Sequence, residues 1–119
     1  KKKRLIYDLN IISKRLKKIH KTLLIKPHPR TNLYIKTSDE PREGGYHIDI
    51  ADPPKNCFTL LLYLENSNGA TQFKESGNII TSERNKAVIF PCCLEHQTIY
   101  QTDVLYRTNI NINFAVLNG

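Results

Sequence analysis

From Thr31 onward, apolar and polar residues alternate with a period of two in short segments. This period is typical of β-strands, whose successive side chains point to opposite faces of a sheet. Turn-forming sequences such as Glu43-Gly44-Gly45 separate the segments. The predicted strands are Asn32–Lys36, Tyr46–Ile50, Cys57–Leu64, Thr71–Lys74, Asn78–Thr81, Ala87–Pro91, His96–Gln101 and Tyr106–Val116. Eight short strands in about 86 residues predict a mainly β chain, an antiparallel double sheet of the jelly-roll type.

The first thirty residues have a different pattern, that of a basic amphipathic helix. Leucine and isoleucine recur at steps of four and three from Leu5 to Leu23, with lysines and arginines mostly between them. The prolines at positions 27 and 29 end this helix, because proline cannot continue it. The 119 residues are expected to form a single domain, with residues 1–30 as the basic helix and Pro-rich connection and residues 31–117 as the jelly roll.

The basic character of the chain belongs to its N-terminal part. Residues 1–36 contain twelve Lys and Arg and one acid, whereas residues 37–119 contain six Lys and Arg and ten acids, which together give the net charge of +7. Two interpretations stay open. The helix could pack on the sheet with its lysines solvated, or it could bind an anionic partner such as nucleic acid.

The cysteine count and the hydropathy give an expectation about the compartment. Three cysteines, Cys57, Cys92 and Cys93, are an odd number, and adjacent cysteines rarely bridge each other. We therefore expect a reduced, intracellular setting, with Cys57 as a small buried residue. No apolar run approaches the roughly 18 residues of a membrane span.

The last predicted strand separates polar from apolar residues most cleanly. Its polar face carries Arg107, Asn109, Asn111 and Asn113, and its other face carries Thr108, Ile110, Ile112 and Phe114. Either the apolar face meets the core and the asparagines face water, or the apolar face packs under the helix and the polar face lines a cavity. The alternation alone leaves both arrangements open.

His47 and Asp49 are the first candidates for a metal site. At positions i and i+2 of a strand, an imidazole and a carboxylate point to the same side. A second histidine from a distant strand would complete a facial triad of two histidines and one carboxylate, which leaves positions open on non-haem Fe(II).

The order of several further motifs extends this pattern. After His47-Ile48-Asp49 come the strand Thr59–Asn66, the turn and strand Asn68–Phe73, the strand Ala87–Pro91, then His96, and Arg107 eleven residues later. This ordered set resembles the catalytic domain of the 2-oxoglutarate- and Fe(II)-dependent dioxygenases, and within them the prolyl 4-hydroxylase-like group. The resemblance covers residues 31–117 and implies a double-stranded β-helix.

The resemblance also implies a role for each matching residue. The iron ligands and catalytic residues would be His47, Asp49 and His96. The far carboxylate of 2-oxoglutarate would pair with Arg107, whose planar fork suits a carboxylate, and Tyr63 would bind the same group, with Thr59 and Leu61 on its face. The cavity that takes the substrate would be lined by Asn109, Asn111 and Asn113.

The implied reaction is hydroxylation of a substrate with O2 and 2-oxoglutarate, giving succinate and CO2, with ascorbate as a candidate reductant. A protein or peptide with prolyl residues is the substrate class that the resemblance implies, and the basic helix makes nucleic acid a second candidate partner.

Two alternatives compete with this interpretation. Cys92 and Cys93 with His47 and His96 would make a closed zinc site of structural character. The chain could also be a non-catalytic jelly roll that binds nucleic acid or an acidic partner through its basic N-terminal helix.

Overall fold

The structure is a computed structural model in which residues 23–24 and 29–116 are described. This part of the chain is mainly β, and all of its strand pairs are antiparallel. The strands are β1 Leu23–Leu24, β2 Arg30–Ile35, β3 Cys57–Tyr63, β4 Ala70–Phe73, β5 Ile79–Thr81, β6 Ala87–Pro91, β7 His96–Ile99 and β8 Tyr106–Val116. The prediction of a mainly β chain with antiparallel sheets is therefore confirmed.

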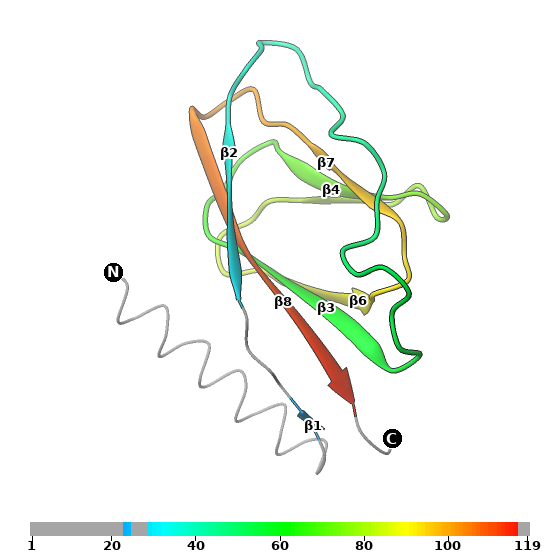
Figure 1. Cartoon of the computed structure of the whole chain (residues 1–119). Coiled ribbons are helices and arrows are strands. Elements are labelled where there is room, and N and C mark those ends of the chain that lie inside the picture. The colour runs from blue at the N-terminus through cyan, green and yellow to red at the C-terminus, as the bar shows by residue number, and fades with distance from the viewer. Residues whose placement is uncertain (1–22, 25–28, 117–119) are drawn as a thin grey trace.

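The strands form two sheets (Figure 1). The larger sheet has the order β1-β8-β3-β6, with β2 also paired to β8, and the smaller sheet has the order β5-β4-β7. Leu61 from the larger sheet packs with Phe73 and Phe90 in one buried cluster. On the opposite face of β3, a second cluster contains Leu60, Leu62, Ile110, Ile112 and Phe114.

The structure decides between the two arrangements of β8. Asn111 pairs with Leu61 across the sheet, so the polar face of β8 lies on the same side as the cluster between the sheets. Arg107, Asn109 and Asn111 are 0 to 5% exposed. The polar face thus points into the interior of the β structure, while the apolar face forms the outer cluster.

Two predicted assignments were wrong, and several other strand ends differ from their predicted positions by one or two residues. The segment Tyr46–Ile50 is not a strand, because His47 forms only an isolated bridge with His96. Gly45 just before it adopts a left-handed conformation, with φ of 95°, which interrupts extended pairing. Leu23 was placed in the helix but lies in β1, because the chain there pairs with the end of β8. The rest of the predicted N-terminal helix, with its packing on the sheet or its binding to nucleic acid, lies outside the described residues.

The expectation of reduced cysteines is wrong for two of the three. Cys57 and Cys92 form a disulfide between β3 and the end of β6, with their Cα atoms 5.5 Å apart. The pairing follows from the antiparallel register, in which Phe58 faces Pro91 and the next pair outward is Cys57 and Cys92. Cys57 is buried, as expected, and Cys93 is a free, exposed cysteine. Within the described residues, no helix is long and apolar enough to cross a membrane.

Candidate metal centre

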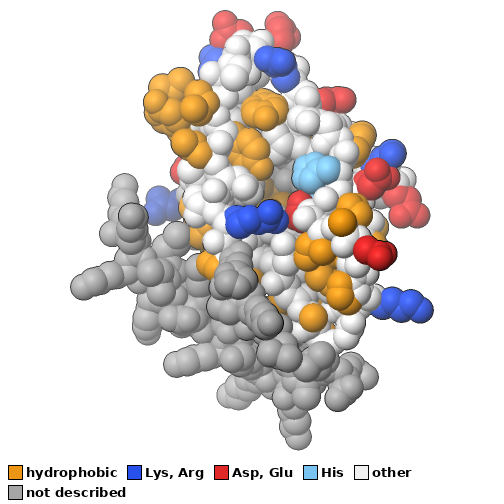
Figure 2. Space-filling model, in the orientation of Figure 1, with side chains coloured by type: hydrophobic (Ala, Val, Ile, Leu, Met, Phe, Trp, Pro, Cys, Tyr) orange, Lys and Arg blue, Asp and Glu red, His pale blue; other side chains and the backbone are white. Residues whose placement is uncertain are grey.

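The side chains of His47 and Asp49, from one connection, meet that of His96, from the distant strand β7. Nε2 of His47 lies 3.3 Å from Oδ1 of Asp49, and Nε2 of His96 lies 3.5 Å from the same oxygen. One ligand atom from each residue lies within 4.8 Å of the others, a geometry that could hold a metal ion. His47 is exposed and His96 is buried, and Figure 2 shows a histidine surface open to solvent on this face. The structure therefore brings together the three residues that the sequence selected as ligands.

The backbone explains how His47 reaches His96 without a continuous strand. The long connection between β2 and β3 runs beside β7 (Figure 1). Gly44 donates its N–H to the carbonyl of Thr98 at 2.8 Å, and His47 and His96 exchange two backbone hydrogen bonds of 3.0 Å each. These bonds hold the two imidazoles at the same edge of the smaller sheet.

A hydrogen bond at Nδ1 orients each of the two imidazoles. Nδ1 of His47 lies 3.1 Å from the carbonyl oxygen of Gly45, and Nδ1 of His96 lies 3.0 Å from that of Leu94. A carbonyl can only accept a hydrogen bond, so Nδ1 carries the proton in both neutral rings. In the neutral rings, both Nε2 atoms therefore have a lone pair, which is the state that binds a metal. The hydrogen bond from Nε2 of His96 to Asp49 forms only when that ring is protonated.

The carboxylate of Asp49 is held in its ionised form. Burial alone raises the pKa of Asp49, but hydrogen bonds from His96 and Asn111 and the nearby imidazoles lower it to about 2. Burial lowers the pKa of His96, yet its contacts with Asp49 and the Leu94 carbonyl raise it above its ordinary value of 6.5. In the metal-free chain, the ionised Asp49 therefore favours a protonated His96, and a bound cation would replace that proton.

A cavity of about 260 Å³ opens next to the three residues. The predicted residues Leu61, Asn109 and Asn111 line it. The lining does not include the other predicted residues, Thr59, Tyr63, Arg107 and Asn113. Further lining residues that the sequence did not single out are Arg30, Asn32, Tyr34, Ile48, Thr71, Gln97 and Thr98. The alternation in β2, β4 and β7 could have pointed to several of them, but only once the inward face of each strand was known.

Asn113 and Thr59 instead bind each other. Thr59 donates its hydroxyl to Oδ1 of Asn113 at 2.8 Å. Thr59 also lies 3.5 Å from the sulfur of Cys92. The structure thus places this pair beside the disulfide, outside the cavity lining.

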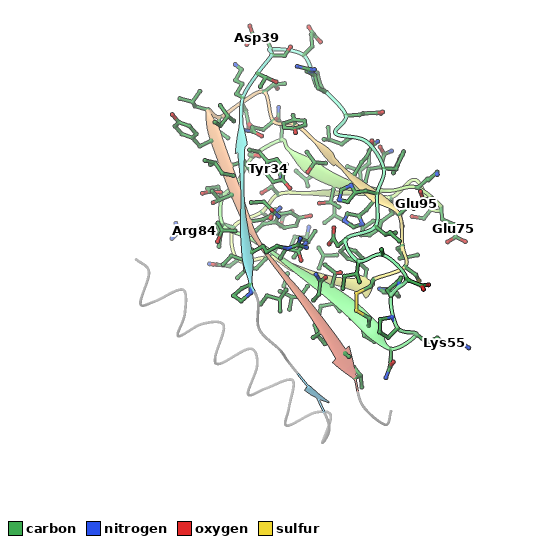
Figure 3. All side chains as sticks on the ribbon, viewed as in Figure 1. Tyr34, Asp39, Lys55, Glu75, Arg84 and Glu95 are labelled. Atoms are coloured by element: carbon green, nitrogen blue, oxygen red, sulfur yellow. A yellow bond between two sulfur atoms is a disulfide. The ribbon has the colours of Figure 1, made fainter. Side chains whose placement is uncertain are left out.

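Arg107 is a fully buried cation without an acidic partner among the described residues. Its guanidinium lies over the ring of Tyr34, with Cζ 4.3 Å from the ring centroid. Nε and Nη2 make long hydrogen bonds of 3.5 Å to Gln101 and to the carbonyl of Ile99, and Nη1 has no partner within the described part of the chain. Burial lowers the pKa of Arg107. The labelled acids Asp39, Glu75 and Glu95 lie at the periphery of the molecule (Figure 3).

Tyr63 and Gly69 from the predicted motifs can also be placed in the structure. Tyr63 is fully buried, and it donates its hydroxyl to Thr71 at 2.8 Å. Gly69 lies against the arginine side chain, since a Cβ atom there would stand 2.4 Å from Nε of Arg107. The glycine of the Asn68-Gly69-Ala70 turn is therefore needed for the close approach of Arg107.

The alternative zinc site does not form. Cys92 is bonded to Cys57, and the metal-competent group found among the described residues consists of His47, Asp49 and His96. Two imidazoles and one carboxylate on one side of an ion leave further positions open, which distinguishes this group from a closed structural site.

Comparison with known proteins identifies a shared fold. No protein-family profile and no curated protein matches the sequence. One solved structure that matches is the non-heme monooxygenase ThoJ, as its nickel complex, with a TM-score of 0.67 and 10% sequence identity. The match covers 88% of this chain and 49% of that one, so the chain spans about half the length of ThoJ. At this identity, the likeness shows a shared fold alone.

Proposed function

We propose that the chain is a 2-oxoglutarate- and Fe(II)-dependent oxygenase built on a double-stranded β-helix. The observation that carries this proposal is the convergence of His47, Asp49 and His96 beside a cavity, on a fold shared with a non-heme monooxygenase. The ordered motifs of the sequence, from His47 to Arg107, support the same class.

The donor set fits Fe(II). His47 and His96 would each bind through Nε2, because their Nδ1 atoms already face carbonyl oxygens. Asp49 would bind through Oδ1, the oxygen that faces both imidazoles. Imidazole and carboxylate are suitable ligands for iron, and three ligands on one side leave positions for other molecules.

A dicarboxylate cosubstrate would satisfy the unpaired cation of the interior. A buried charge without a partner is costly, and Nη1 of Arg107 has none among the described residues. Its planar fork would bind the far carboxylate of 2-oxoglutarate. Thr71 lines the cavity and accepts a hydrogen bond from the Tyr63 hydroxyl. In this proposal, the two hydroxyl groups would contact the same carboxylate.

When bound, Fe(II) and 2-oxoglutarate supply oxidative decarboxylation with O2, coupled to hydroxylation of a C–H bond, with succinate and CO2 as products. The chain itself provides binding, orientation and exclusion of water. Asp49 and the imidazoles fix the metal position, Arg107 fixes the far end of the cosubstrate, and the amides of the cavity wall contact the substrate.

The first substrate class to test is a prolyl peptide. This choice rests on the resemblance of residues 31–117 to the prolyl 4-hydroxylase-like group, because a shared fold does not define a substrate. The cavity is compatible with a peptide, since Asn32, Asn109 and Thr98 offer hydrogen bonds that suit backbone amides.

The test uses the full chain with Fe(II), 2-oxoglutarate, O2, ascorbate and a proline-rich peptide. We expect succinate formation that requires Fe(II) and is lost in His96→Ala and Asp49→Ala, because each removes a ligand. The control is Asp39→Ala, which removes an exposed aspartate that pairs with Lys36. A folded wild-type chain that neither binds a divalent metal nor consumes 2-oxoglutarate would refute the proposal.

A further inference from the structure

The side chain of Asn111 makes one hydrogen bond in the described structure, and it goes to Asp49. Nδ2 of Asn111 donates to Oδ2 of Asp49 at 2.8 Å. The other oxygen of this carboxylate, Oδ1, faces His47 and His96. Asn111 is 5% exposed and lines the cavity beside Asp49. Asn111 therefore holds the carboxylate through Oδ2, while Oδ1 faces the two imidazoles.

The neighbouring asparagines of β8 bind differently. Asn109 accepts a hydrogen bond from Asn32 of β2 at 2.9 Å, and Asn113 accepts one from Thr59 of β3 at 2.8 Å. Both bonds connect paired strands of the larger sheet. Asn111 makes no such bond, because its side chain extends from β8 to the connection between β2 and β3.

The second polar atom of Asn111 argues against a purely structural role. Its Oδ1 is buried and has no hydrogen-bond partner among the described residues. A buried, unpaired carbonyl oxygen costs free energy, and an apolar side chain would avoid that cost. Unpaired buried polar atoms in native structures call for a functional explanation, and the one bond that Asn111 does make leads to a proposed metal ligand.

On the basis of the proposed metal centre, we propose that Asn111 is a positioning residue that fixes the orientation of the Asp49 carboxylate. Without the amide, the carboxylate would be free to rotate about its side-chain bonds, and Oδ1 would no longer be held toward the imidazoles. Partners that orient metal ligands typically change metal affinity by about 10- to 100-fold when they are removed.

The experiment measures binding of Co(II) alone to the full chain, from its visible absorption spectrum. We expect Asn111→Ala and Asn111→Ser to bind Co(II) about 10- to 100-fold more weakly than the wild type. Their Co(II) spectra should also change, because the carboxylate binds in altered geometry. The serine variant keeps a small polar side chain that is too short to reach Asp49.

The matched control is Asn113→Ala, on the same face of β8 and outside the cavity lining, which should leave Co(II) affinity and spectrum unchanged. Circular dichroism identifies variants that fold, and if Asn111→Ala does not fold, Asn111→Ser decides the question.

Folded Asn111 variants with wild-type Co(II) affinity and spectrum would overturn the positioning role, while the metal centre would stand. A wild-type chain that binds no Co(II) would overturn the metal centre and this role together. Weakening confined to the Asn111 variants supports the role even when no succinate is formed.

Discussion

The substitution Arg107→Met tests whether Arg107 stabilises the fold or binds a ligand. Methionine has similar length and no charge, so it removes the buried guanidinium with little change in packing. Nη1 of Arg107 is buried and has no partner in residues 23–24 and 29–116. This unpaired nitrogen destabilises the wild type by about 1–3 kcal/mol, and the substitution removes that cost. It also removes the stacking on Tyr34 at 4.3 Å, worth about 0.5–2 kcal/mol of stabilisation. The two hydrogen bonds at 3.5 Å are too long to contribute much.

These opposing contributions nearly cancel. We therefore expect the free energy of unfolding of the ligand-free Arg107→Met variant to lie within about 1 kcal/mol of the wild-type value, since replacing buried charges by apolar groups is often neutral or stabilising. Affinity for 2-oxoglutarate should fall sharply. Loss of one side of a buried carboxylate pair costs about 2–5 kcal/mol, which is roughly 30-fold to several thousand-fold in Kd.

The assay combines urea unfolding of the ligand-free chain with titration of 2-oxoglutarate into the Ni(II)-loaded chain. Arg84→Met is the control, because Arg84 is exposed at the periphery (Figure 3) and should change neither quantity. Destabilisation of ligand-free Arg107→Met by more than about 3 kcal/mol would mean that the arginine is structural. Unchanged 2-oxoglutarate affinity would refute its role as an anchor.

Three further predictions concern the surroundings of the site. Gly69→Ala should destabilise the chain by about 1–3 kcal/mol and weaken 2-oxoglutarate binding, because the new Cβ would collide with Arg107. Removing the disulfide with Cys57→Ser and Cys92→Ser, which are 35 positions apart, should lower the free energy of unfolding by about 3–4 kcal/mol in urea titrations. In the metal-free chain, the stability that protonated His96 contributes is fully present below pH 6.5 and is lost as the pH rises through its raised pKa. Co(II) affinity should rise over the same pH range, since the metal needs neutral imidazole.

Each of these predictions has a control and a contradicting result. Gly44→Ala, where the nearest atom is 3.4 Å away, should be tolerated better than Gly69→Ala, and equal effects would contradict the close approach of Arg107. Cys93→Ser should leave stability unchanged, and a matching loss would mean that the disulfide is not the cause. A metal-free unfolding midpoint that is flat above pH 6.5 in wild type would contradict the contribution of His96.

Strands whose own residues alternate and are bounded by turn sequences could be predicted. Ala87–Pro91 and Tyr106–Val116 were predicted with their observed bounds, because alternation and turn residues define both ends. The segment around His47 could not be predicted correctly, since its pairing depends on the left-handed Gly45 and on the edge of β7. The disulfide was missed for a similar reason, because a cysteine count contains no information on strand register.

The candidate ligands were found because their residue types and order are specific, although the local argument for two of them assumed a strand that does not form. His47 and Asp49 reach the same point through a loop instead. The partners that orient them could not be predicted. The carbonyls of Gly45 and Leu94 are backbone atoms, and the role of Asn111 depends on which oxygen of the carboxylate it meets.

The interior of this β structure contains unpaired polar atoms, which a roll that only has to fold does not need. Arg107 and Asn111 lie on the same face of β8, and each has one buried atom that finds no partner in the part of the chain that the structure describes. Apolar side chains at these positions would remove that cost. The cost is offset if an anion and a metal occupy the interior, because a ligand that binds only the folded chain stabilises it by about 2.7 kcal/mol at 100 times its Kd. Metal and 2-oxoglutarate together should therefore raise the unfolding midpoint of the wild type more than that of Arg107→Met, and equal shifts would contradict this account of the polar interior.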